Sequence, residues 1–245
     1  MKLMEKSTPF VVAENLSKNY TTVKALSEVT FSLDPGIWGL IGPNGAGKTT
    51  LLNLIWGIIH PSSGSLSILG FDPTQDDLRL KKQLGVCFTS QGFSYGYSCK
   101  DYLRMVASAY DIPLVFINSL VFFLLETLEL DSVINRDTRE LSSGMKQKLA
   151  IAQCLVGLPH LAILDEPFAN LDPYAKVYVR DLFLKFYNTF ETNFLISSHS
   201  LEDLAAFCTN YLFIDRGKVL WQGSSKEVPK DDLLDFYLRI TATAD

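Results

Sequence analysis

The sequence lacks an apolar run long enough to cross a lipid bilayer. Its most apolar stretch, residues 114–125, covers 12 residues and already contains Asn118 and Ser119, whereas a spanning helix needs about 20 apolar residues. The N-terminal residues also lack the apolar segment of a secretory signal peptide. We therefore expect no transmembrane segment and no secretion by this route.

Cysteine and positive charge are scarce as well. The 245 residues contain 4 cysteines and no C-x-x-C pair, which argues against a disulfide scaffold and favours a reducing cytosol. Lys and Arg number 22 against 27 Asp and Glu, a net charge of −5, and a negative chain is poorly suited to binding nucleic acid. Hydrophobic residues make up 47%, enough to bury the core of one large domain or of one domain with an insertion.

Short apolar runs alternate with helical patterns along most of the chain. Alternation in residues 9–33 predicts antiparallel strands that end at a turn over 34–36, and a helix is expected over 49–59, before Pro61 and a turn over 62–64. Residues 99–157 are helical in pattern throughout, which predicts an inserted helical subdomain. Buried strands are expected at residues 37–41, 85–88, 161–164, 194–197 and 211–215, with a hairpin from the last of these to 219–222.

A glycine-rich loop lies between the first buried strand and the helix. It matches G-x-x-x-x-G-K-[S/T], a loop whose backbone N–H groups wrap the α- and β-phosphates of a nucleotide. Lys48 would reach the β- and γ-phosphates and the Thr49 hydroxyl would bind Mg²⁺. The N-terminus of the following helix adds partial positive charge. The loop reads Gly42, Pro43, Asn44, Gly45, Ala46, Gly47, Lys48, Thr49.

Two carboxylates end the apolar strand at 161–164. In a protein with such a loop, the first of them, Asp165, completes the Mg²⁺ shell. The second, Glu166, can act as the general base toward the attacking water. An acidic turn at the end of a strand is the alternative for this pair, and the loop at 42–49 favours the catalytic interpretation.

Leu141 to Lys146 precede an amphipathic helix that carries Leu149, Ala152 and Val156 on one face. The start of a helix favours residues such as Ser142, Ser143 and Gly144, so helix capping alone can explain their presence. Their hydroxyls and the helix N-terminus could also face a γ-phosphate.

These segments together resemble the nucleotide-binding subunit of ABC transporters. The resemblance covers roughly residues 10–225, with the motifs in the family's order. Tyr20 resembles the aromatic that stacks on adenine, Gln91 the Q-loop glutamine, and His199 the switch histidine that contacts the γ-phosphate. Ser142 and Gly144 match the signature loop, Asp165 and Glu166 the Walker B carboxylates, and residues 169–172 the D-loop, which ends at Asp172.

The resemblance implies ATP and Mg²⁺ as cofactors and a role for each matched residue. It implies catalytic roles for Lys48, Gln91, Glu166 and His199, and Mg²⁺ binding by Thr49, Gln91 and Asp165. Nucleotide contacts are implied for Tyr20, the whole loop from Gly42 to Thr50, Ser142, Ser143, Gly144 and Asp172.

The signature departs from the family's commonest form, LSGGQ. Here Ser143 replaces a glycine and Met145 replaces glutamine, and a thioether is only a weak hydrogen-bond acceptor. Gly144-Met145-Lys146-Gln147 is similar to the signature of drug, antibiotic and bacteriocin exporters that use a type-2 export permease. The departure thus indicates a branch of the family and puts a nucleotide contact from position 145 in doubt.

The expected fold is α/β: a P-loop core with a mainly parallel sheet, an antiparallel N-terminal β-layer and an inserted helical subdomain. Within a single ABC ATPase domain, residues 8–91 and 154–225 would form the core, 92–153 the helical subdomain and 226–245 a helical tail. In the family that the chain resembles, the signature of one copy completes the ATP site of another, so the resemblance implies an ATP-dependent dimer, either homodimer or heterodimer. A membrane permease would hold this dimer at the cytoplasmic face of the membrane.

Three other functions compete with transport. A non-transport ABC ATPase acting on ribosomes usually carries two such loops in one chain, and one acting on DNA a long coiled coil; the sequence has neither. A P-loop GTPase or kinase would leave the signature unexplained, and no N-K-x-D guanine motif occurs. The third alternative is a regulatory module that binds ATP without hydrolysing it, and measurable Mg²⁺-dependent hydrolysis would exclude it.

An aromatic segment follows Gln91. Phe93, Tyr95 and Tyr97 are separated by Gly and Ser, a composition that suits an adaptable contact loop better than a strand or a helix. In the family this stretch lines the groove for the permease's cytoplasmic helix. We hypothesise that the three rings contact that helix; the alternative is that they pack the helical subdomain.

Overall fold

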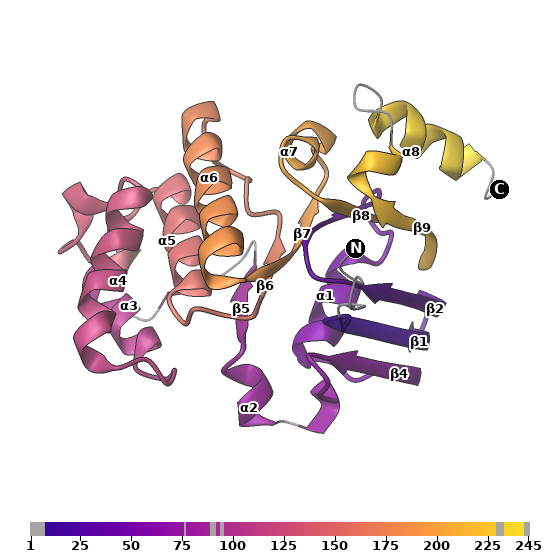
Figure 1. Cartoon of the computed structure of the whole chain (residues 1–245), viewed down its shortest axis with the longest axis horizontal. Helices are drawn as coiled ribbons and strands as arrows, with labels where there is room; N and C mark the ends of the chain where they lie inside the picture. Colours follow the sequence, from indigo (N-terminus) through magenta and orange to yellow (C-terminus); the bar gives the residue numbers. More distant parts are fainter. Residues whose placement is uncertain (1–7, 76, 89–91, 94–95, 229–232, 243–245) are drawn as a thin grey trace, which may run out of the picture. The chain divides into compact units, whose positions relative to one another are not determined.

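The computed structural model describes residues 8–75, 77–88, 92–93, 96–228 and 233–242. The chain divides into two compact units, one from the described residues between Met1 and Leu80 and between Leu204 and Asp245, the other from Lys81 to Asp203 (Figure 1). The helices are α1 Lys48–Trp56, α2 Leu78–Lys81, α3 Cys99–Ala107, α4 Leu114–Thr127, α5 Ser143–Leu155, α6 Pro173–Phe190, α7 Leu201–Ala205 and α8 Leu233–Ala242.

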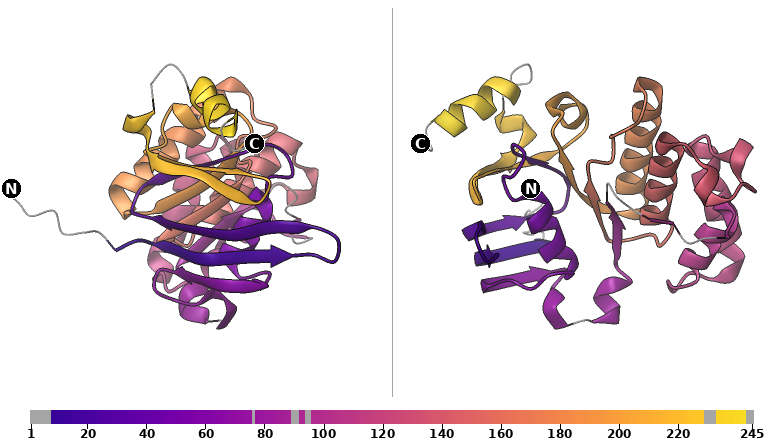
Figure 2. Two further views of the ribbon diagram at one scale, coloured as in Figure 1. Left: turned by 90° about the vertical axis from the view of Figure 1, so that its right-hand side faces the viewer. Right: turned by 180° about the vertical axis from the view of Figure 1, so that it is seen from behind.

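An antiparallel sheet opens the first unit. Strand β1 (Val11–Asn19) pairs on one side with β2 (Lys24–Leu33) and on the other with β4 (Ser63–Ile68), and the three strands lie side by side in Figure 2. The alternating residues Val11 and Ala13 are buried, because successive side chains of a strand point to opposite faces. This sheet is the antiparallel layer that the sequence predicts.

A second set of strands in the first unit carries the glycine-rich loop. Strand β3 (Ile37–Ile41) runs parallel to β8 (Asn210–Asp215), and β8 pairs antiparallel with β9 (Lys218–Ser224). All five residues of β3 are buried, as expected for a strand covered on both faces. The loop leaves the carboxyl end of β3 and leads directly into α1.

Parallel strands and helices build the second unit. Strands β5 (Leu84–Cys87), β6 (Leu161–Asp165) and β7 (Asn193–Ser198) pair in parallel, with Asp165 opposite Ser197. Helices α3, α4 and α5 contact one another, and α5 also packs on β5 (Figure 1). The carboxyl ends of parallel strands meet at one edge of a sheet, which is the usual position of a site in an α/β fold.

The predicted fold class is confirmed, with two local errors. Helix α1 ends at Trp56 rather than at Ile59 because Gly57 adopts a left-handed φ of 78° and its N–H bonds back to Asn53 and Leu54. Ser63 and Gly64, predicted as part of a turn, begin strand β4. Gly64 permits this, since a Cβ there would lie 2.3 Å from the carbonyl oxygen of Asn15.

No helix in the described residues is both long enough and apolar enough to span a bilayer. The apolar helix α4, which contains the whole stretch noted in the sequence, has 14 residues.

Candidate functional site

Packing in the first unit forces glycine at both ends of the loop between β3 and α1. A Cβ at Gly42 would lie 2.1 Å from the carbonyl oxygen of Ile214, and one at Gly47 would lie 2.7 Å from that of Ala25. Gly47 also has a left-handed φ of 106° and forms the N-cap of α1 without any side-chain hydrogen bond to the helix. Gly45, at φ 80°, has open space around its Cβ position. The loop is therefore fixed at its ends and open at its tip.

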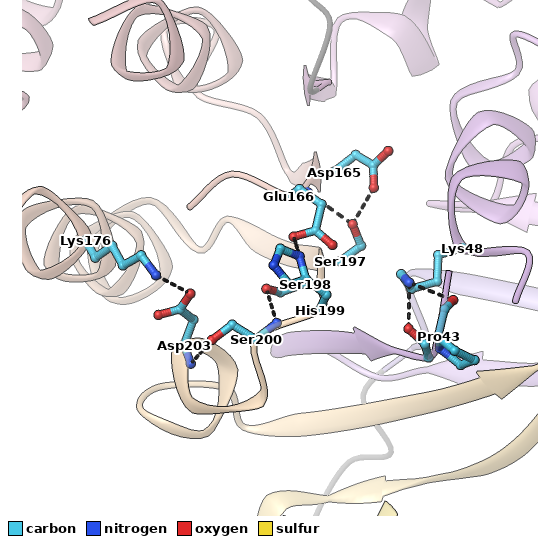
Figure 3. A network of polar contacts seen from close by, with 11 residues as sticks. Pro43, Lys48, Asp165, Glu166, Lys176, Ser197, Ser198, His199, Ser200 and Asp203 are labelled. Atoms are coloured by element: carbon cyan, nitrogen blue, oxygen red, sulfur yellow. Dashed lines mark hydrogen bonds and ion pairs between the residues drawn. The ribbon is translucent and has the colours of Figure 1, made fainter. Parts of the chain in front are cut away.

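Lys48 places its ammonium group inside this loop. Its side chain is buried, and Nζ donates to the carbonyl oxygens of Gly42 at 2.6 Å and Pro43 at 3.1 Å (Figure 3). A buried charge is tolerated only with such partners. Thr49, the next residue, is exposed, whereas Thr50 is partly buried. The loop thus concentrates a cation, glycine backbone and a hydroxyl at the start of a helix, which suits the phosphates of a nucleotide.

Tyr20 lies in the same unit, just after β1. The residue is 48% exposed, and the Nζ atom of Lys18 lies over the ring, 5.4 Å from its centroid. An exposed aromatic residue of this kind can accept a stacked base. Lys18 is held by the carbonyl oxygen of His60 at 2.7 Å, so the cation beside the ring has a fixed position.

The two acidic residues of the second unit lie at the end of β6. Asp165 is the buried last residue of the strand, and its Oδ1 accepts a hydrogen bond from the Ser197 hydroxyl on β7 (Figure 3). Glu166 follows with a φ of 51°, a left-handed conformation that costs free energy in a residue with a Cβ. The chain therefore turns sharply between the two carboxylates.

His199 comes directly after β7 and faces Glu166. Its Nδ1 lies 2.8 Å from Oε2 of Glu166 (Figure 3). The His199 side chain is 71% exposed, whereas that of Glu166 is 19% exposed. One ring nitrogen is thus engaged by the carboxylate while most of the ring lies open. The sequence alone does not predict this contact, because it depends on the pairing of β6 with β7.

The signature segment forms the N-terminus of α5. Ser142 is the N-cap, and its Oγ accepts from the N–H of Met145 at 3.3 Å. Ser142 and Ser143 are exposed. A Cβ on Gly144 would lie 2.9 Å from the carbonyl oxygen of Asn170, so glycine allows the signature segment to approach the D-loop. An exposed helix N-terminus with two hydroxyls is suited to an anion.

Asp172, expected to touch nucleotide, is engaged in the fold. Its Oδ1 accepts from the N–H of Ala175 at 2.9 Å and caps α6. This backbone hydrogen bond lowers the pKa of the Asp172 carboxyl from its usual value. Gln91, expected as a catalytic and metal-binding residue, lies outside the described residues.

The structure brings Asp165, Glu166 and His199 together at the ends of β6 and β7, and it brings the signature segment against the D-loop. Sequence reasoning missed Ser197, which bonds to both acidic residues. A hydroxyl two positions before His199 was visible in the sequence, but the partner of a strand residue follows from the register of the sheet.

Each of the two units holds an oxygen donor of the kind that Mg²⁺ binds. Mg²⁺ prefers oxygen ligands and is usually held by one or two protein groups plus substrate phosphates. In the second unit Asp165 supplies a carboxylate, and in the first unit the exposed residue Thr49 supplies a hydroxyl. No group of three or more His, Cys, Asp or Glu side chains in the described parts of the chain could hold a metal ion by itself.

The known proteins that this chain is similar to are described as ABC transporter or ATP-binding proteins. Residues 26–169 match the family model described as ABC transporter. The chain is 30% identical over 204 residues to the ABC transporter ATP-binding protein NatA of Bacillus subtilis (strain 168), covering 82% of each chain. It is 29% identical over 223 residues to the Nod factor export ATP-binding protein I of Ralstonia nicotianae, covering 91% of this chain and 69% of that protein.

A solved structure described as the ATP binding subunit of an ABC transporter has a TM-score of 0.85 and 26% sequence identity to this chain. The match covers 95% of this chain and 99% of the other.

Proposed function

Because the chain belongs to the ABC transporter family, as one of its ATP-hydrolysing subunits, we propose that it powers export through a separate membrane permease. The relative from Ralstonia nicotianae, named for Nod factor export, supports this direction. So does the segment Gly144 to Gln147, which resembles the signature of exporters with a type-2 permease. Docking to the permease would place the subunit on the cytoplasmic face of the membrane.

In this proposal the loop from Gly42 to Thr50 binds the phosphates of ATP. Backbone N–H groups surround the α- and β-phosphates, and Lys48 exchanges its two carbonyl partners for β- and γ-phosphate oxygens, which are stronger partners because they are charged. Tyr20, a half-exposed residue, stacks on the adenine ring.

The hydroxyl of Thr49 and the carboxylate of Asp165 would hold the Mg²⁺ that accompanies ATP, with Gln91 as a further ligand. When bound, the ion would supply positive charge against the negative charge of the phosphates. Both protein groups are oxygen donors, as this ion requires.

The contact of 2.8 Å between Glu166 and His199 is the observation that carries the proposed catalytic roles. Glu166 accepts a proton from a water molecule while the oxygen of that water attacks the γ-phosphorus. The bond between the γ-phosphorus and the oxygen that bridges it to the β-phosphate breaks, which gives ADP and phosphate. His199, fixed on one side by Glu166, turns its exposed ring toward the γ-phosphate and stabilises the charge that develops there.

A second ATPase subunit completes the site. Ser142, Ser143 and Gly144 of one copy face the γ-phosphate held by the loop of the other, with the D-loop residue Asp172 beside it. The exposed N-terminus of α5 supports this role, since it can accept an anion from outside its own chain. ATP binding then closes the dimer and hydrolysis opens it, and the permease converts this motion into transport.

Nucleotide binding and phosphate release by the purified chain test the proposal. Lys48→Ala removes the cation of the loop, and we expect severe loss of ATP binding and turnover below a few per cent of the wild-type rate, about 10²-fold lower or more. The matched control is Lys82→Ala, which removes a lysine from the exposed pair with Asp111 and costs little stability. Turnover by Lys48→Ala at the rate of this control would contradict the proposal.

A further inference from the structure

Ser197 occupies a buried position opposite Asp165. It is the fifth residue of β7, paired in register with Asp165 on β6, and its side chain has 0% exposure. A serine hydroxyl buried so completely costs free energy unless it is hydrogen-bonded. The two bonds that it makes both lead to the acidic residues of the site.

The hydroxyl proton of Ser197 points to one carboxylate. Ser197 Oγ donates to Oδ1 of Asp165, and Figure 3 shows the two side chains facing each other. A carboxylate can rotate about the single bond that links it to its side chain, and a hydrogen-bond donor on one of its oxygens restricts that rotation. A hydrogen bond from a neighbouring side chain to a metal ligand fixes the direction in which that ligand presents its oxygens.

The same oxygen atom accepts from the second acidic residue. The N–H of Glu166 lies 3.1 Å from Oγ of Ser197 and 3.2 Å from its backbone oxygen, so Ser197 supplies both acceptors of this N–H. Glu166 needs such support because its φ of 51° is left-handed. The peptide that carries the Glu166 side chain toward His199 is thus held by Ser197.

The neighbouring serine has a different role. Ser198 is almost as buried, at 2% exposure, but its Oγ accepts from the N–H of Ser200 at 3.0 Å. Successive strand residues point to opposite faces, so Ser198 supports the turn into α7 and not the acidic pair. Burial of polar residues on β7 therefore does not by itself account for the bonds of Ser197.

We propose that Ser197 is a positioning residue that aims both acidic groups of the site, Asp165 toward Mg²⁺ and Glu166 toward the attacking water. This inference rests on the proposed roles of Asp165 and Glu166. Ser197 transfers no proton in the reaction; its proton stays on Oγ, donated to Asp165, throughout. Its loss weakens metal binding and catalysis while the phosphate-binding loop around Lys48 keeps its affinity.

Two substitutions separate the hydrogen bonds of Ser197 from its volume. Ser197→Ala removes the hydroxyl, and Ser197→Cys keeps a side chain of similar shape with only a weak donor and acceptor. Thr192→Val is the matched control. Thr192, just before β7, is equally buried, and its hydroxyl donates to the carbonyl oxygen of Pro159 at 2.8 Å, away from the acidic residues.

The readouts are ATP binding in EDTA, the Mg²⁺ concentration that gives half of the thermal stabilisation by a non-hydrolysable ATP analogue, and kcat. For Ser197→Ala we expect ATP affinity in EDTA within about twofold of wild type. The Mg²⁺ requirement should rise and kcat should fall by about tenfold or more, the usual effect of removing the hydrogen-bond partner of a metal ligand. Ser197→Cys is expected to share the defect. Thr192→Val is expected to lose stability while keeping the Mg²⁺ requirement and kcat.

Three results would overturn the inference. The first is a normal Mg²⁺ requirement and kcat in Ser197→Ala. The second is recovery of both in Ser197→Cys, which would assign the defect to packing. The third is the same defect in Thr192→Val. If Ser197→Ala does not fold, Ser197→Cys decides by the same two readouts. A Glu166→Gln variant run in parallel keeps the two ideas apart. Wild-type turnover by Glu166→Gln contradicts the proposed function, whereas its inactivity beside a normal Ser197→Ala contradicts only the role of Ser197.

Discussion

The Nδ1 atom of His199 lies 2.8 Å from the Oε2 atom of Glu166, across the ends of two parallel strands. The carboxylate is largely covered and the ring is largely open. In the proposed mechanism, the group that takes a proton from water and the group that contacts the γ-phosphate are therefore in direct contact with each other. This pairing makes separate predictions for the two residues.

Glu166→Gln should keep ATP binding and stop hydrolysis. The amide has the shape of the carboxylate but cannot accept a proton, and loss of a general base typically lowers the rate by about 10²–10⁴-fold. ATP then persists in the site, and an ATP-bound dimer should be visible by size-exclusion chromatography with Mg·ATP, most clearly with the permease present. Glu126→Gln, an exposed residue of α4, is the control. Hydrolysis by Glu166→Gln at the control rate would show that Glu166 is not the base.

His199→Ala should lose most hydrolysis with little loss of nucleotide affinity. A γ-phosphate contact contributes mainly in the closed, reacting state, so its removal affects kcat more than binding. His160→Ala removes another exposed histidine and should leave kcat unchanged. ATP and ADP affinities, measured by titration, separate the two roles of His199, because a structural histidine would lower both affinities equally.

Much of the fold follows from local sequence patterns. Strand β3 and helix α1 are marked by an apolar run and by glycine spacing, which act within a few residues. Strand β4 was missed because Ser63 and Gly64 have turn propensity, and only the pairing with β1 makes them a strand. The end of α1 depends on the backbone conformation of Gly57, which the apolar pattern up to Ile59 conceals.

The site likewise has a part that local sequence predicts and a part that it does not. Lys48 and Glu166 belong to contiguous motifs, and the sequence predicts them as site residues from those motifs. The contact between Glu166 and His199 and the bonds of Ser197 join residues more than thirty positions apart. Such contacts depend on which strands pair and in what register, and register is a property of the whole sheet. Asp172 shows the converse, since its side chain serves the adjacent helix α6.

The four cysteines should be unreactive in the folded protein. All four are buried and free of disulfides. Burial raises the pKa of the Cys87 thiol to about 12 and also raises the pKa values of Cys99, Cys154 and Cys208. Since the thiolate is the reactive form and a raised pKa makes it scarce, titration with Ellman's reagent at pH 8 should detect no thiol before denaturant is added and all four afterwards. Rapid reaction of any thiol in the native protein would contradict this.

The aromatic segment after Gln91 is predicted to contact the permease mainly through Tyr97. Tyr95 lies outside the described residues. Phe93 is partly buried and its ring meets that of Tyr102 edge-on, 5.4 Å between centroids, while Tyr102 is itself fixed by a hydroxyl bond of 2.5 Å to Gln153. These contacts favour the packing alternative for Phe93. Tyr97 is 39% exposed and leaves a large amphipathic ring for a partner.

Tyr97→Ala should therefore reduce co-purification with the permease and transport, with ATP binding and the melting temperature of the isolated subunit unchanged. Phe93→Ala is the informative comparison, because removing a packed ring should lower the melting temperature first. The same assays with a Tyr95→Ala, Tyr97→Ala double variant measure what the neighbouring ring adds. Unchanged co-purification and transport in the double variant would reject the docking hypothesis. A lowered melting temperature in Tyr97→Ala would instead assign Tyr97 to the packing of the helical subdomain, where its backbone oxygen already accepts from the N–H of Thr138 at 3.1 Å.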